Sequence, residues 1–141
     1  MRKSSKALFV LFTAACLSAY ADEPKIVKVG SSPAELDQLL SAPAAVKKTT
    51  PVRTTTAVPI FNSKDEKMTS GVFVSTAGHA EYDSYPANEF IYIISGEATL
   101  TSADGSVLKI KKGDALVIPK GWKGNWTTSG YQKFFVDYKG D

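Results

Sequence analysis

A short stretch near the middle of the chain holds the side chains best suited to chemistry. Asp83, Tyr85 and Glu89 follow one another closely, and Glu89 opens an apolar run. A carboxylate that starts a buried strand needs a partner or a raised pKa. Glu89 is therefore the candidate catalytic residue, as a metal ligand, a general base or an anchor for a basic ligand group. The alternative is a structural glutamate paired with Lys133 or hydrogen-bonded to Tyr85.

The only histidine in the chain is His79, directly after Gly78. One imidazole cannot form a histidine cage, but with Glu89, Asp83 and water it can hold Mn²⁺ or Fe²⁺ weakly. Zinc is less favoured, because it takes three or four protein ligands. We expect no metal and no other cofactor, with His79 exposed to solvent. A manganese or iron ion held by His79 and Glu89 is the alternative.

Two tryptophans and a lysine are further candidates for ligand binding. Trp126 follows Gly124 by two residues and shares its face if the strand is regular; its indole then offers a flat wall and one N–H donor, or simply fills the core. Trp122 stands in a loop and can close a rim. Lys133 alternates with Asp137 in the last strand and points either into a pocket or to solvent. The predicted ligand-binding residues are Asp83, Tyr85, Glu89, Trp122, Trp126 and Lys133.

The elements that must position these residues are strands. Short apolar runs rich in β-branched and aromatic residues are separated by Gly, Pro, Asn, Asp or Ser. Asp104-Gly105 lies between two such runs and is typical of a two-residue hairpin. Strands this short and this closely spaced fit a sandwich or a jelly-roll barrel. The runs span residues 58–61, 71–74, 90–94, 98–101, 107–110, 115–118 and 134–138.

The spacing Asp83-x-Tyr85-x3-Glu89-x6-Gly96, followed by Gly113-x5-Pro119-x-Gly121-x2-Gly124, resembles the two signature motifs of the cupin family. The resemblance implies an all-β, RmlC-like jelly-roll barrel with the first motif at its mouth. Metal-binding cupins carry three histidines and a glutamate in these motifs. Here the glutamate position is kept as Glu89, whereas the three histidine positions hold Asp83, Tyr85 and Gly124. The resemblance thus implies the barrel without its usual metal cage.

Within the cupins, the stretch from Phe61 to Tyr138 resembles the subfamily named for ureidoglycine aminohydrolase. The subfamily includes a manganese-dependent aminohydrolase and a domain linked to ethanolamine utilisation. The resemblance to it implies a pocket role for Lys133. The residues that carry the resemblance are Gly71-Val72-Phe73, Gly78, Asn88 to Thr101, Asp104-Gly105, Lys112 to Ala115, Ile118 to Trp126 and Lys133.

Residues 1–21 have the order of a secretory signal peptide. A basic start is followed by the apolar run Ala7 to Leu17 and by Ala19-Tyr20-Ala21, an A-x-A cleavage site. The run is too short to span a bilayer. We therefore expect a periplasmic or secreted protein. A lipoprotein anchored at Cys16 and a buried N-terminal helix are the alternatives.

Removal of this segment balances the charge of the chain. It holds three of the 17 Lys and Arg residues and none of the 14 Asp and Glu residues, so 14 bases and 14 acids remain. A balanced chain gives no reason to expect a nucleic-acid partner. The only cysteine leaves as well, so the mature chain has no disulfide and no thiol nucleophile. We also expect no membrane association after cleavage.

Residues 22–56 precede the barrel domain, which we place at residues 57–141. Ser32-Pro33-Ala34-Glu35 is a capping box with proline at the first helical position, so a short helix follows. Lys47 to Pro59 is rich in Thr, Val and Pro and is typical of an extended arm. The arm can pack along the barrel, pack against a second subunit or cover the pocket as a lid. We expect a homodimer, formed through a sheet face or an exchanged arm.

Three classes of function fit these features. The first is an exported cupin that binds a small molecule without metal-dependent catalysis, since three histidines are replaced and no nucleophile–base pair is present. The second is an enzyme resembling ureidoglycine aminohydrolase that uses a metal, or Glu89 alone as a base, on a small nitrogen-containing or carboxylate substrate. The third is a structural or dimer-forming accessory domain. The sequence names no ligand.

Overall fold

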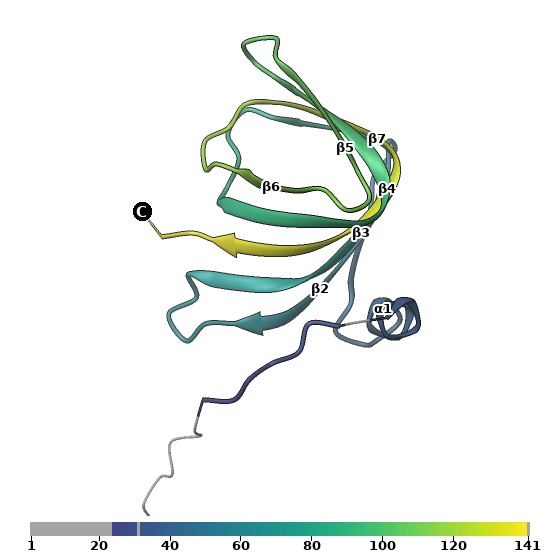
Figure 1. The fold of residues 1–141 in the computed structure, drawn as a ribbon, viewed down its shortest axis with the longest axis vertical. Coiled ribbons are helices and arrows are strands. Elements are labelled where there is room, and N and C mark those ends of the chain that lie inside the picture. The colour runs from purple at the N-terminus through teal and green to yellow at the C-terminus, as the bar shows by residue number, and fades with distance from the viewer. Residues whose placement is uncertain (1–23, 31, 141) are drawn as a thin grey trace, which may run out of the picture.

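The chain folds into one antiparallel sheet that curls into a barrel, as Figure 1 shows. The computed structural model describes residues 24–30 and 32–140; the predicted signal peptide and its cleavage site lie outside these residues. The strand order across the sheet is β1-β2-β3-β7-β4-β5, and β6 pairs with β4. The predicted all-β jelly-roll fold is confirmed. The elements are α1 (Pro33–Leu40), β1 (Val46–Thr49), β2 (Thr54–Asn62), β3 (Met68–Tyr82), β4 (Asn88–Ser102), β5 (Val107–Lys111), β6 (Ala115–Ile118) and β7 (Gly124–Tyr138).

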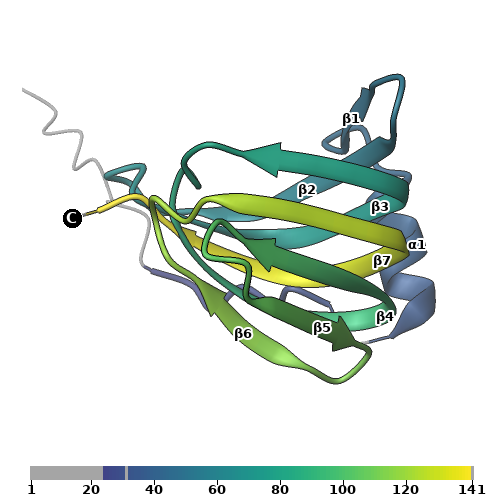
Figure 2. The ribbon, with the colours of Figure 1, turned by 90° about the horizontal axis from the view of Figure 1, so that it is seen from above.

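Three long strands build most of the barrel. β3, β4 and β7 each contain 15 residues and curve strongly, so that each runs along two walls (Figures 1 and 2). In β4 the ladder with β7 carries β-bulges on both sides of Gly96, and bulges bend a strand. Gly96 has a φ of 76°, and a Cβ there would lie 2.0 Å from the carbonyl oxygen of Gly130. The two runs predicted at 90–94 and 98–101 are therefore one strand bent at a glycine.

The curvature brings together the loops that follow β3 and β6. The N–H of Tyr85 donates to the carbonyl of Trp122 at 2.8 Å, and the N–H of Gly121 donates back to the carbonyl of Tyr85 at 2.8 Å. These two bonds tie the first signature segment to the second. They hold Tyr85 at the place where the side chains of both segments meet.

The helix lies outside the barrel, against β2 and β3. Ser32 has an extended backbone and accepts a hydrogen bond from the N–H of Glu35 at 3.3 Å, as the capping-box pattern predicts. Leu36 points inward from the helix and is 4% exposed. β1 and the start of β2 come from the segment expected to be an arm. Nothing among the described residues forms a helix that is long and apolar enough to cross a membrane.

Candidate functional site

Glu89 lies in the barrel interior as part of a closed, charged cluster. Its Oε1 accepts a hydrogen bond from the Lys133 ammonium at 2.5 Å, and its Oε2 accepts one from the hydroxyl of Tyr85. Glu89 and Lys133 are each 4% exposed, and Tyr85 is 7% exposed. The carboxylate is thus neutralised by an ammonium on β7 and held by a phenol from the neighbouring loop. The structure brings together three of the predicted site residues.

Two aromatic rings also lie next to the ammonium. The Lys133 Nζ lies 5.1 Å from the centroid of the Phe73 ring and 5.3 Å from that of Trp126. Such distances give a favourable cation–π interaction, which gains strength away from water. Trp126 also stacks on Tyr131 at 5.2 Å between centroids. Trp126 faces inward, as expected from its place two residues after Gly124, and is 1% exposed.

Both buried phenols of the cluster stay protonated. Burial, followed by the negative charge of Glu89, raises the pKa of Tyr85 well above its ordinary value of 10. Burial likewise raises the pKa of Tyr131, with smaller effects of Tyr82 and Glu89. Tyr85 therefore acts as a hydrogen-bond donor to Glu89. A phenolate able to bind a metal is not accessible at neutral pH.

Asp137 is a site residue that the sequence analysis did not single out. It lies directly opposite Glu89 in the β4–β7 ladder, so both carboxyl groups share the inner face. Burial, then the charge of Glu89, raises the pKa of Asp137 to about 6, although Lys133 and Lys139 oppose the shift. The sequence does contain a signal for this position, because side chains alternate between the two faces along a strand. Asp137 follows Lys133 by four residues, so an inward lysine implies an inward aspartate.

An aromatic rim lies next to this cluster. The ring of Tyr85 is 6.1 Å from that of Trp122 and 4.8 Å from that of Tyr82, and Trp122 and Tyr82 are half-buried. The indole N–H of Trp122 donates to the hydroxyl of Ser102 at 3.0 Å. Trp122 and Ser102 line a hollow of about 110 Å³. Its other walls are apolar, from Leu100, Leu108, Leu116, Val117, Ile118 and Pro119.

The residues present do not fit a first-row transition metal. His79 is exposed on β3, Asp83 is exposed in the loop that follows, and Glu89 is already engaged by Lys133. The third histidine position is also closed, since a Cβ on Gly124 would lie 2.3 Å from the carbonyl oxygen of Thr101. No three His, Cys, Asp or Glu side chains form a group suited to a metal within residues 24–30 and 32–140. The weak site built from His79 and Glu89 stays a prediction without geometric support.

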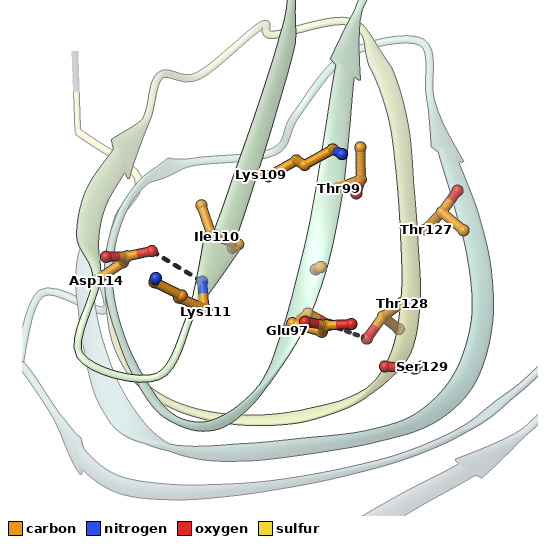
Figure 3. A pocket seen from close by; sticks show the side chains of 10 residues that line it. Glu97, Thr99, Lys109, Ile110, Lys111, Asp114, Thr127, Thr128 and Ser129 are labelled. Carbon is orange, nitrogen blue, oxygen red and sulfur yellow. Dashed lines mark hydrogen bonds between the residues drawn. The ribbon is translucent and has the colours of Figure 1, made fainter.

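A larger hollow of about 550 Å³ lies over β4, β5 and β7, away from Glu89. Figure 3 shows Lys109 and Lys111 on one side of it and Thr127 on the other. Its charged side chains are exposed except that of Asp114, which is half-buried. Two of its oxygen groups are engaged with backbone: Asp114 accepts from the N–H of Lys111, and the hydroxyl of Thr128 donates to the carbonyl of Glu97. We favour the smaller hollow beside Trp122 as the candidate site, because Tyr85 connects it to the buried charges.

Comparison with known proteins identifies the family. Residues 62–134 match the model of the EutQ-like cupin domain, so the chain belongs to this cupin family. No curated protein matches the sequence significantly.

Solved structures with the same fold are distant in sequence. A DUF861-family protein of unknown function from Pseudomonas syringae is 21% identical, with a TM-score of 0.57 over 65% of this chain. This chain spans only 43% of that protein. The EutQ protein of Clostridium difficile is 18% identical, with a TM-score of 0.55 over 67% of this chain and 75% of its own. A Rhizobium leguminosarum protein of unknown function is 14% identical, with a TM-score of 0.57 over 83% of this chain and 100% of its own. These likenesses concern the fold alone.

Proposed function

We propose that the protein is an exported cupin that binds a small molecule without a metal. The observation that carries the proposal is the ion pair between Glu89 and Lys133, which gives the acid of the first motif a cation from the protein itself. A carboxylate with both oxygens engaged by Lys133 and Tyr85 has no strong position left for a divalent ion. The ligand is therefore recognised by side chains and not through a metal.

The hollow beside Trp122 is where we place the ligand. Apolar walls with a small number of polar groups are typical of small-molecule sites. Trp122 offers an aromatic face, and the hydroxyl of Ser102 adds a polar group at the same wall. A volume of about 110 Å³ suits the ring or short chain of a small, mainly apolar molecule, with any polar end toward the hydroxyl of Ser102.

A thermal-shift screen with small aromatic and aliphatic metabolites tests this function. Binding to the folded state raises the melting temperature by mass action. We expect at least one compound to stabilise the wild type, and Trp122→Ala to abolish that shift. The matched control is Lys109→Ala in the larger hollow, which should keep it. Loss of the shift in Lys109→Ala but not in Trp122→Ala would place the ligand in the larger hollow.

Export is the second component of the proposal. It rests on the basic start, the apolar run and the A-x-A site of residues 1–21. We expect protein made from the whole reading frame to accumulate outside the cytoplasm and to begin at Asp22 in an intact-mass measurement. A lipid-modified product starting at Cys16 would identify a lipoprotein instead. A full-length product retained in the cytoplasm would overturn export.

An enzyme is the second candidate, and Asp137 is the specific observation that favours it. A carboxyl group with a pKa of about 6, opposite a second carboxylate in a barrel, can both accept and donate a proton near neutral pH. The resemblance to ureidoglycine aminohydrolase suggests ureidoglycine as the probe, with ammonia release as the readout. Turnover by the wild type that is lost in both Glu89→Gln and Asp137→Asn would favour an enzyme over a protein that only binds a small molecule. Wild-type ammonia release at the uncatalysed rate would count against this reaction.

A further inference from the structure

The indole N–H of Trp126 is a buried hydrogen-bond donor without a partner in the described part of the chain. Trp126 lies on the inner face of the barrel and is 1% exposed. Among residues 24–30 and 32–140, its Nε1 is the one buried side-chain nitrogen or oxygen that makes no hydrogen bond. Buried polar groups are nearly always hydrogen-bonded, because an unpaired donor retains the cost of leaving water. An exception next to a candidate site therefore needs a physical explanation.

The second tryptophan of the chain provides a comparison. The indole N–H of Trp122 donates to the hydroxyl of Ser102 at 3.0 Å, and its ring is half-buried at the rim. The chain contains two tryptophans. One indole N–H is thus paired within the protein, whereas the deeper one is not.

Strand register connects Trp126 to the hollow beside Trp122. Leu108 of β5 lies opposite Leu100 of β4, and Leu100 lies opposite Trp126 of β7. Residues directly opposite one another in antiparallel strands point to the same side. Both leucines line the hollow of about 110 Å³. The exposed fraction falls along this row from 50% at Leu108 to 5% at Leu100, so the row leads from solvent, along the hollow, to the unpaired indole.

A second row connects the same hollow to the buried charges. Ile118 lines the hollow and lies opposite Glu89, which lies opposite Asp137. Lys133 pairs with Glu89, and its Nζ is 5.3 Å from the centroid of the Trp126 ring. This cluster therefore combines two carboxyl groups with one ammonium. An anionic ligand would add a further negative charge, and a buried charge without a partner is costly. A neutral ligand group fits the cluster better.

Hydrogen bonding narrows the choice to an acceptor. An indole N–H and an ammonium can donate but cannot accept. A carbonyl oxygen only accepts, so it matches the free N–H of Trp126 and is attracted by the positive charge of Lys133. A water molecule would bring two O–H groups that need acceptors, and both oxygens of Glu89 already accept hydrogen bonds, from Lys133 and Tyr85. A neutral carbonyl group therefore matches both the charge and the donors of the site.

We propose that the N–H of Trp126 binds the carbonyl oxygen of a neutral ligand, such as a ketone, an ester or a tertiary amide, whose apolar part occupies the hollow beside Trp122. The inference rests on the proposed function, because it names the inner polar group of the same ligand. The hydroxyl of Ser102 serves a second polar group at the wall of the hollow. Since Trp126 is 1% exposed, the carbonyl reaches it when the Leu100 side chain changes its rotamer. Trp126 thereby selects neutral acceptors over acids and amines.

Nuclear magnetic resonance of the two indole groups tests the proposal. Labelled with ¹⁵N, protein expressed from the whole chain gives two indole cross-peaks, and the Trp122→Phe variant assigns them by removing one. The probes are cyclopentanone, cyclopentanecarboxylate and cyclopentylammonium, which share a ring and differ in the charge of the polar group. Titration up to about 50 mM covers millimolar affinities. We expect cyclopentanone to move the indole proton of Trp126 downfield, as a new hydrogen bond does, and to bind roughly tenfold more tightly than either charged probe.

Other results separate this inference from the proposed function. Trp126→Phe keeps an aromatic ring without the N–H, so it should weaken cyclopentanone roughly tenfold, with a melting profile to establish that it is folded. The wild-type titration decides the matter if this variant does not fold. A Trp122 peak that moves with cyclopentanone, while that of Trp126 does not move downfield, overturns the inference and leaves a ligand in the hollow. Equal binding of the carboxylate overturns the selection of a neutral group. No movement of either peak with any probe counts against both proposals.

Discussion

The ammonium of Lys133 and the carboxylate of Glu89 lie 2.5 Å apart, with each side chain 5% exposed. At such burial the loss of one partner leaves an uncompensated charge in the barrel. The stability of the barrel interior therefore depends on two residues that lie 44 positions apart in the chain.

Removing the ammonium alone should strongly destabilise the protein. We expect Lys133→Met to lower the free energy of unfolding by about 3–5 kcal/mol, because Glu89 stays buried without its partner. The double variant Lys133→Met/Glu89→Leu should recover much of the loss. Lys28→Met is the control, since its pair with Glu35 is exposed and contributes less than about 1 kcal/mol. Equal losses for Lys133→Met and Lys28→Met in urea unfolding would contradict the buried pair.

Asp137 should make stability depend on pH with a defined sign. Its folded pKa of about 6 exceeds the ordinary 3.8, so the folded state binds more protons between these values. The stabilising contribution is complete below pH 3.8 and is lost as the pH rises through 6. Asp137→Asn should therefore gain stability over the wild type as the pH rises from 4 to 8, by on the order of 1 kcal/mol after solvent screening.

An exposed aspartate provides the control for this pH dependence. Hydrogen bonds from Ser63 and the N–H of Lys67 lower the pKa of Asp65. Its contribution has the opposite sign, being present at neutral pH and lost in acid. Asp65→Asn should thus lose stability relative to the wild type as the pH rises. A gain for Asp137→Asn that is independent of pH, measured by urea unfolding, would show that the carboxyl group does not titrate as described.

Restoring a histidine at position 124 should not restore a metal site. A Cβ at Gly124 would lie 2.6 Å from Cζ2 of Trp122 as well as close to backbone, so the strand must shift to admit any side chain. We expect Gly124→His to lower stability by about 1–3 kcal/mol, as overpacking does, and to bind no manganese in isothermal titration. Gly105→His is the control for overpacking, because nothing lies within 4 Å of a Cβ at that position. Its only structural cost is backbone strain, since Gly105 has a φ of 85°.

Chelation should leave the protein unchanged. Because Glu89 is satisfied by Lys133 and Tyr85, we expect well under one equivalent of transition metal by elemental analysis of untagged protein. The melting temperature should be the same with and without EDTA. Near one equivalent of manganese or iron, lost in Glu89→Gln or His79→Ala, would favour the enzyme and contradict the side-chain-based site.

The sequence predicted the jelly-roll fold and the helix with its cap, because alternation, turn glycines and capping residues act locally. It did not predict the length of the strands. Gly96 interrupts the apolar pattern, which suggested two strands, whereas the glycine lets β4 bend without ending. Local patterns do not distinguish a turn from a bend, since the difference depends on the Gly130 carbonyl, which lies far along the chain.

The contacts of the site were only partly predictable for a similar reason. The sequence left open whether Glu89 is a functional residue or a structural one paired with Lys133 or Tyr85. In the structure, Glu89 contacts both Lys133 and Tyr85. The sequence could not show that they occur together, because Lys133 reaches Glu89 only once β7 lies beside β4. The position of Asp137 followed from the same register. Whether these residues bind a ligand stays a prediction.

The position of β7 has a consequence for how the chain acquires its fold. β7 is the last strand in the sequence, yet it lies between β3 and β4 and pairs with both along their whole length. A growing chain therefore cannot complete the barrel until β7 (Gly124–Tyr138) has been synthesised, and until then the edges of β3 and β4 that β7 will occupy stay unpaired. Such non-local pairing slows folding to milliseconds or longer. The barrel thus cannot close before β7 is made, and loss of β7 would separate the two halves of the sheet.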